Sequence, residues 1–242
     1  MNNTRLTKTF ISAMIVAATV TAGYASTISH TMHPYLALAV LALAMATSRM
    51  RVKLPGINGN MSMNLPFLLT AAIALSGAEA VAIAFLSTVV QCWPRNRANF
   101  KPEQMAFNLA TMSFAAASAS LVSHATWLSH TSWNSNALGL ILAAMTLFLS
   151  QTAPVAGVVA VSESKKIGAI WWALAHLSFP YYVVSAGITS MVEAVGNHLG
   201  WGLALGVFPV MYGIYRSYRV YFSRIADSVQ PEVLVRGAGA GA

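Results

Sequence analysis

The sequence predicts an all-α protein, a polytopic bundle of about eight transmembrane helices, or six if one helical hairpin is re-entrant, with both termini in the cytoplasm. The first observation is composition: the 242 residues are 57% hydrophobic and only 8% charged. Soluble domains carry about 25% charged residues. A chain with so few charges cannot cover a water-facing surface, so most of its surface is expected to face lipid.

The second observation is where the cations lie. All but one of the 14 Lys and Arg residues fall in five short clusters, separated by apolar stretches. Cations near membrane segments are retained in the cytoplasm, so each interval between clusters is expected to cross the membrane an even number of times. The clusters are Arg5/Lys8, Arg49/Arg51/Lys53, Arg95/Arg97/Lys101, Lys165/Lys166 and Arg216/Arg219/Arg224. Membrane topology thus explains the net charge of +8 without nucleic acid as a partner.

The first interval is expected to hold two spans, near Phe10–Ser29 and Met32–Ser48, joined by a short outer turn. Each has the ~17–25 residues that a helix needs to cross the hydrocarbon layer. The small residues from Thr21 to Ser26 also resemble a signal-peptidase site, so a cleaved signal peptide is the alternative for the first span.

The second interval contains one long apolar stretch, Met63–Trp93, after the turn-rich segment LPGINGNMS. One helix of this length would place the next cations outside, whereas two helices keep them inside. A tight outer turn is expected from Ser76 to Glu79, with Gly77 breaking the first helix. Ser62 or Asn64 is the expected cap of the first helix. Both halves are short, and a re-entrant hairpin gives the count of six.

The last four spans follow the same rule. The third interval holds the spans Glu103–Ser123 and Asn136–Val161. In the fourth interval the first span starts at Gly168 and ends at a turn near Gly196–His198, and the second span is Leu199–Tyr215. Residues 1–225 therefore form one transmembrane helical domain, and 226–242 a short disordered cytoplasmic tail.

Most histidines are expected on the outer side, where loops could converge into a metal site or a pH-responsive patch. The spacing matches no metal motif, so ordinary loop histidines are the alternative, and the metal is unknown. The candidates for ligand binding or pH sensing are His30, His33, His124, His130, His198, Glu79 and Glu193.

Polar residues within the spans are the second set of candidates, because polar groups in a bilayer usually face the bundle interior or a cavity. They are His176, Gln91, Gln104 and Asn108. The alternative for His176 is an interhelical hydrogen bond. The chain has one cysteine, Cys92, and no catalytic or cofactor-binding motif, so neither an enzyme nor a bound cofactor is expected.

The segment YGIYRSYRVYFSRI, residues 212–225, alternates Tyr and Arg after the last span. Aromatic and cationic side chains suit the membrane boundary and anionic lipid heads. The segment is either a simple membrane anchor or a helix that passes a signal to the cytosol. For the second function the candidate residues are Arg216, Tyr218, Arg219 and Arg224.

Five stretches in order carry a resemblance to a known family. They are LPGINGNMSMNLPF, EAVAIAFLSTVVQCW, PEQMAFNLATMSFA, FPYYVVSAGI and YRSYRVYFSRI. Over residues 35–225 the chain resembles the multispanning N-terminal membrane sensor (MASE-like) modules that precede bacterial cyclic-di-GMP signalling domains of the GGDEF and HD-GYP types. The resemblance implies a bacterial inner-membrane input module, and no ligand-binding residue is carried over with it.

The sequence therefore favours a sensory or interaction module of the inner membrane, without a catalytic output domain of its own. Its expected partners are the lipid bilayer and a cytoplasmic signalling protein or a second copy of the chain. The alternative is a small-solute transporter or a membrane substrate-binding subunit, because Pro and Gly interrupt several spans.

Overall fold

The chain is described from a computed structural model. The structure describes residues 2–28, 32–53, 60–93, 101–126, 128 and 135–199, and positions 209, 210, 212–214, 216, 217 and 220 beyond them. Its helices are α1 (Asn2–Thr27), α2 (Pro34–Ser48), α3 (Leu65–Ala74), α4 (Gly77–Cys92), α5 (Pro102–Ser123), α6 (Ser135–Glu163) and α7 (Ile167–Leu199), and two short strands, β1 (Arg51–Lys53) and β2 (Asn60–Ser62), precede α3.

Four of these helices are long and apolar enough to cross a membrane. They are α1, α5, α6 and α7, over the ranges Arg5–Thr27, Pro102–Ser123, Ala137–Glu163 and Ile167–Ala194. Their side chains are largely exposed to the surroundings of the bundle, with 17–50% of each span buried inside the protein. The helical architecture and its compatibility with a multi-pass membrane protein agree with the sequence prediction.

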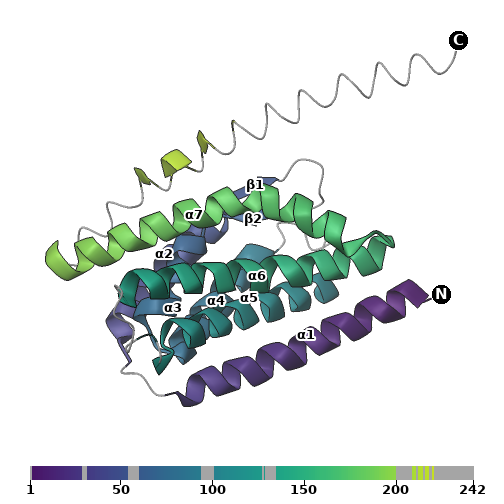
Figure 1. The fold of residues 1–242 in the computed structure, drawn as a ribbon, viewed down its shortest axis with the longest axis horizontal. Helices are drawn as coiled ribbons and strands as arrows, with labels where there is room; N and C mark the ends of the chain where they lie inside the picture. The colour runs from purple at the N-terminus through teal and green to yellow at the C-terminus, as the bar shows by residue number, and fades with distance from the viewer. Residues whose placement is uncertain are drawn as a thin grey trace, which may run out of the picture.

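The helices run along one axis and gather different residues at the two ends of the bundle (Figure 1). Lys8 of α1 pairs with Glu103 of α5 at 3.1 Å, so these two helices are parallel and begin at the same end. The turn between α6 and α7 also lies at this end (Figure 1). We call it the basic end, for Arg5, Lys8, Lys101, Lys165 and Lys166, and the opposite end the histidine end, for His33 and His124.

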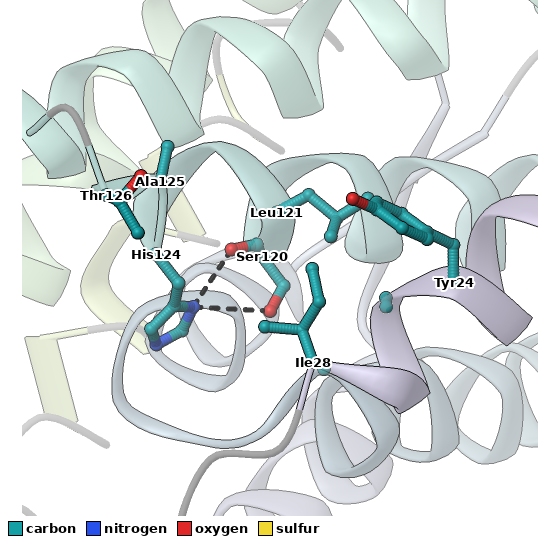
Figure 2. Close-up of a pocket in the computed structure, with 9 residues that line it drawn as sticks. Tyr24, Ile28, Ser120, Leu121, His124, Ala125 and Thr126 are labelled. Atoms are coloured by element: carbon teal, nitrogen blue, oxygen red, sulfur yellow. Dashed lines mark hydrogen bonds between the residues drawn. The ribbon is translucent and has the colours of Figure 1, made fainter.

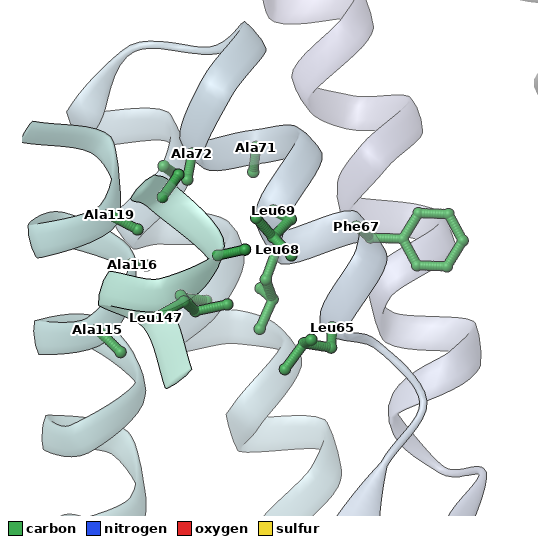
Figure 3. Close-up of a cluster of buried hydrophobic side chains, with 14 of the residues drawn as sticks. Leu65, Phe67, Leu68, Leu69, Ala71, Ala72, Ala115, Ala116, Ala119 and Leu147 are labelled. Carbon is green, nitrogen blue, oxygen red and sulfur yellow. The ribbon is translucent and has the colours of Figure 1, made fainter. Parts of the chain in front are cut away.

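The short helix α3 is enclosed by the other helices and forms the centre of the core (Figure 3). It contacts α2, α4, α5, α6 and α7. Its residues from Leu65 to Ala72 are all buried. A helix that is apolar all round is stable only when it is surrounded in this way, which explains the unbroken apolar sequence of this segment.

The length of α3 changes the expected count of crossings. Ten residues of α-helix span about 15 Å, half of a hydrocarbon layer of ~30 Å. The 15 residues of α2 and the 16 of α4 span about 22 and 24 Å. The described helices thus supply four full-length candidate spans and not eight, and the predicted last span, Leu199–Tyr215, lies largely outside the described residues together with the tail 226–242.

The predicted turn between α3 and α4 is present, and a capping box fixes it. It lies slightly earlier than predicted, because α3 ends at Ala74 and Gly77 is the first residue of α4 and not the residue that breaks α3. The Ser76 hydroxyl accepts a hydrogen bond from the backbone N–H of Glu79, and the Glu79 carboxylate accepts one from the N–H of Ser76 at 3.0 Å. Such a box satisfies two of the donors that the first turn of a helix leaves open. Gly77 then packs directly on α1, since a Cβ at this position would lie 2.5 Å from the Ala25 carbonyl oxygen.

Helix α1 packs on α5 and α6 along its length. Near the basic end the Phe10 ring lies 6.4 Å from the Phe107 ring, measured between centroids. The same ring fills the space above Gly157 of α6, where an added Cβ would lie 2.9 Å from its Cζ. The predicted first span is therefore an integral part of the bundle in this structure.

The segment before α3 contains a β-hairpin that the sequence pattern did not predict. Strands β1 and β2 pair antiparallel, with Val52 opposite Met61, and the Met63 N–H donates to the Met50 carbonyl at 3.2 Å. The turn-rich residues 54–59 lie outside the described residues. The hairpin returns the chain toward the core, and Asn64 occupies the N-cap position of α3. Its side chain makes no capping hydrogen bond and instead donates to the Ser87 hydroxyl at 3.4 Å, so the predicted side-chain cap is absent.

Candidate functional site

A pocket of about 310 Å³ opens at the histidine end between α1, α4 and α5 (Figure 2). It lies where the end of α1 and the end of α5 approach the first residue of α4. Its walls are formed by Tyr24, Ala25, Ile28, Gly77, Ser120, Leu121, His124, Ala125 and Thr126. We call it the Tyr24–His124 pocket.

His124 provides the polar side of this pocket, and its ring is held by the last turn of α5 (Figure 2). Its Nδ1 lies 2.9 Å from the Ser120 carbonyl oxygen and 3.2 Å from the Ser123 hydroxyl. A carbonyl oxygen only accepts hydrogen bonds, so Nδ1 carries the hydrogen. Ser123 in turn donates to the Ala72 carbonyl at 2.8 Å, which connects the pocket to the end of the central helix α3.

The opposite side of the pocket is apolar and comes from α1. The Tyr24 ring reaches toward Leu121 of α5, and Ile28 lies between Tyr24 and His124 (Figure 2). Tyr24 is 62% exposed, so the aromatic wall is also the accessible edge of the pocket. Side chains from two helices thus form one apolar and one polar half.

Glu79 and His33, two predicted candidates, come together beside this pocket but serve as helix caps. The Glu79 carboxylate accepts from the Ser76 hydroxyl at 2.7 Å and from the His33 backbone N–H at 3.1 Å. It therefore joins the start of α4 to the start of α2. The backbone of His33, not its exposed imidazole, makes this contact.

The remaining outer candidates are described only in part. Glu193 is half-buried on α7, and His198 lies in the last turn of that helix. His30 and His130 lie outside the described residues. Within the described ranges no three His, Cys, Asp or Glu side chains are placed to hold a metal ion together, so the structure brings no metal centre together from the predicted residues it describes.

The polar candidates within the spans have different surroundings. His176 is exposed on α7, with its ring 4.9 Å from the Trp172 ring, and no hydrogen bond to it occurs among the described residues. The expected interhelical bond is thus absent there, because the residue lies on the outer face of the helix. Gln104 is exposed as well. Asn108 is half-buried and donates to the Cys92 sulfur at 3.4 Å, whereas the Gln91 Oε1 atom is buried without a partner in the described part of the chain.

Sequence reasoning missed a line of buried polar residues on the inner face of α7. The Tyr182 hydroxyl donates to Gln151 Oε1 of α6, and Thr189 donates to the Pro66 carbonyl of α3 at 3.1 Å. Ser185, between them, is fully buried, and its hydroxyl has no partner among the described residues. The spacing 182, 185 and 189 follows one helix face, which is the signal that could have revealed the line.

The predicted signal-output segment is described at few positions. Arg216 and Ser217 are helical and exposed, and Ile214 packs against the hydrophobic core around α3. Tyr218, Arg219 and Arg224 lie outside the described residues. The output role of the segment stays a prediction.

The whole chain was also compared with known proteins. Comparisons with models of protein families, with curated proteins and with solved structures found no match. The candidate site is therefore interpreted from its own chemistry.

Proposed function

We propose that the chain is a multi-pass protein of the bacterial inner membrane that acts as a sensory or input module. Four long apolar helices and the gathering of cations at one end support the membrane location. With the basic end in the cytoplasm, the Tyr24–His124 pocket lies on the outer side. This pocket is the observation that carries the proposal.

The helices that form the pocket walls offer a route by which ligand binding changes the structure on the other side of the membrane. They come from α1, α4 and α5, and both α1 and α5 run the full length to the basic end. A ligand that bridges α1 and α5 binds better to one relative position of the two helices, and a ligand shifts an equilibrium only through such a difference in affinity. Ion pairing between Lys8 and Glu103 joins the same two helices at the basic end.

The proposed receiver of the signal is a cytoplasmic signalling protein or a second copy of the chain, contacted by the helix around Arg216. The resemblance of residues 35–225 makes a cyclic-di-GMP signalling enzyme the first partner to test.

An experiment tests the coupling directly. Ser217 is exposed, so a Ser217→Cys variant in a Cys92→Ala background accepts an environment-sensitive fluorophore. In nanodiscs, divalent metals, pH and small uncharged aromatic alcohols are screened. The proposal expects a saturable change in emission that disappears when the pocket is filled by Ala125→Phe. A flat response across the screen, from protein with intact unfolding transitions, would contradict it.

A second candidate is a small-solute transporter, which one specific observation favours. The half-length helix α3 starts inside the bundle, next to the buried residues Ser185 and Thr189 of α7. Interrupted helices with polar groups near mid-membrane form the solute sites of many transporters. Uptake into proteoliposomes separates the two functions: accumulation that Ser185→Ala abolishes would support transport and displace the sensory proposal.

A further inference from the structure

We propose that the Tyr24–His124 pocket binds a small, uncharged molecule with an aromatic or compact apolar body and one hydrogen-bonding group. The inference rests on the proposed sensory function, for which it names the chemical class of the input. Three properties of the pocket walls support this ligand class: their size, their charge and the separation of apolar from polar groups.

The size of the pocket sets the size of the ligand. Its volume of about 310 Å³ lies at the lower end of the range of ≈300–1,000 Å³ for small-molecule sites. Ala25 and Gly77 form part of the wall and belong to the close contact between α1 and α4, so this part has little room to open. A single-ring molecule fits such a space, whereas a peptide or a whole lipid does not.

The charge of the walls favours a neutral ligand. No Lys, Arg, Asp or Glu is among the described residues that line the pocket. The nearby carboxylate of Glu79 is occupied by the N–H of Ser76, the Ser76 hydroxyl and the N–H of His33. Burial of a charge without a partner is unfavourable, and a permanently charged ligand would find no Lys, Arg, Asp or Glu partner among the described lining residues. His124 is the one imidazole there, and its Nδ1–H is already directed at the Ser120 carbonyl oxygen.

The separation of the walls sets the orientation of the ligand. The apolar body lies against Tyr24, Ile28 and Leu121, which form the apolar side of the pocket (Figure 2). The hydrogen-bonding group lies at the Ser120 side, where a hydroxyl is already held beside the fixed imidazole of His124 at 3.5 Å. An offset stack between two aromatic rings is favourable beyond the area that it buries, and Tyr24 is the residue that offers such a contact.

The test uses three probes of nearly equal shape and different charge, which are benzyl alcohol, benzoate and benzylamine. Tyr24 is replaced by 3-fluorotyrosine in the full chain in nanodiscs, and its fluorine NMR shift is followed during titration. The proposal expects a saturable shift with benzyl alcohol and only linear drift with the two charged probes. The control label at Tyr35, which is 88% exposed on α2, should drift linearly with all three.

Two variants assign the shift to the pocket. Ala125→Phe, which fills the pocket, should abolish saturation, whereas Ala169→Phe on an exposed position of α7 should leave it unchanged. Leu121→Ala, which removes apolar contact without adding bulk, should weaken binding roughly fivefold or more. Leu121→Ala keeps the test informative if the larger side chain of Ala125→Phe prevents folding.

The outcomes separate this inference from the sensory proposal. Saturation by benzoate or benzylamine, or by none of the three probes, overturns the assignment of a neutral ligand. If benzyl alcohol saturates the Tyr24 label but leaves the Ser217 fluorophore silent, the pocket assignment stands and the sensory function fails. If the fluorophore responds to another compound while Tyr24 is unaffected, the sensory function stands and this site is wrong.

Discussion

Gly77 shows how one residue fixes the relation between two helices. An added Cβ would meet backbone atoms of Ala25, at 2.5 Å from the oxygen and 3.0 Å from the carbon, and backbone cannot move aside as a flexible side chain can. We expect Gly77→Ala to lower the free energy of unfolding by about 1–3 kcal/mol, the usual cost of overpacking. Thermal or denaturant unfolding in detergent measures it.

Gly187 supplies the matched control, since nothing lies within 4 Å of a Cβ at this position on α7. Alanine is a better helix former than glycine by about 1 kcal/mol, so Gly187→Ala should be neutral or stabilising. A loss of stability at both positions would mean that the close contact between α1 and α4 is not the cause.

Ser185 and Thr189 are one turn apart on α7, and removal of their hydroxyls is expected to have opposite effects on the free energy of unfolding. Thr189 donates to the Pro66 carbonyl, so Thr189→Val should lower the free energy of unfolding by about 0.5–1.5 kcal/mol. The buried Ser185 hydroxyl lacks a partner among the described residues, and Ser185→Ala should therefore be neutral or stabilising. The same unfolding measurement compares them, and a destabilising Ser185→Ala would indicate a water or solute bound to this hydroxyl.

At the scale of elements, Glu79 connects the starts of α2 and α4. Its carboxylate accepts hydrogen bonds from Ser76 and from the His33 N–H. Loss of a cap lowers stability by about 1 kcal/mol, with a range of ≈0.5–2, and Glu79 serves two helix starts. We expect Glu79→Ala to lower the free energy of unfolding by about 1–2 kcal/mol.

The control for this prediction is Glu103→Ala at the other end of the bundle. Glu103 and Lys8 are 58% and 60% exposed, and exposed ion pairs contribute about 0–1 kcal/mol. Equal losses from the two variants, measured by the same unfolding transition, would show that the capping contacts of Glu79 add nothing beyond the removal of a surface charge.

The elements show where sequence reasoning succeeds and where it ends. The turn at Ser76–Glu79 was predictable, because a helix breaker and a cap residue are local signals. The enclosure of α3 was not, because a continuous apolar run of this kind suits a lipid-facing span and a buried core helix equally well. The strands β1 and β2 were missed since three residues are too few to show an alternating pattern.

The candidate site was also predictable only in part, because its walls bring together residues that are far apart in the sequence. His124 was a candidate as a histidine near a helix end, but Tyr24 and Ile28 reach it from a helix about 100 residues earlier. The candidacy of Glu79 rested on its charge, and its contacts show a capping role. The spacing of Ser185 and Thr189 shows that they share one face of α7, but their burial depends on packing between α3, α6 and α7, which no local pattern reveals.

At the scale of the whole molecule, the two ends of the bundle carry different residues, and this difference predicts the orientation in the membrane. Arg5, Lys8, Lys101, Lys165 and Lys166 lie at the basic end, and the Tyr24–His124 pocket lies at the other, where α1 and α5 end. Because cations near membrane segments are retained in the cytoplasm, we propose that the pocket lies on the outer side. The sensory proposal depends on this orientation, whereas the proposed neutral ligand rests on the walls of the pocket alone.

The most direct test of this orientation is the accessibility of single cysteines in spheroplasts of a bacterial host. In a Cys92→Ala background, cysteine is placed at Tyr35, near the histidine end, and at Ser162, near the basic end, both of which are exposed. A membrane-impermeant maleimide should label Tyr35→Cys in intact spheroplasts and Ser162→Cys only after permeabilisation. The reverse order would place the pocket in the cytoplasm, and equal labelling without permeabilisation would contradict the membrane-spanning bundle itself.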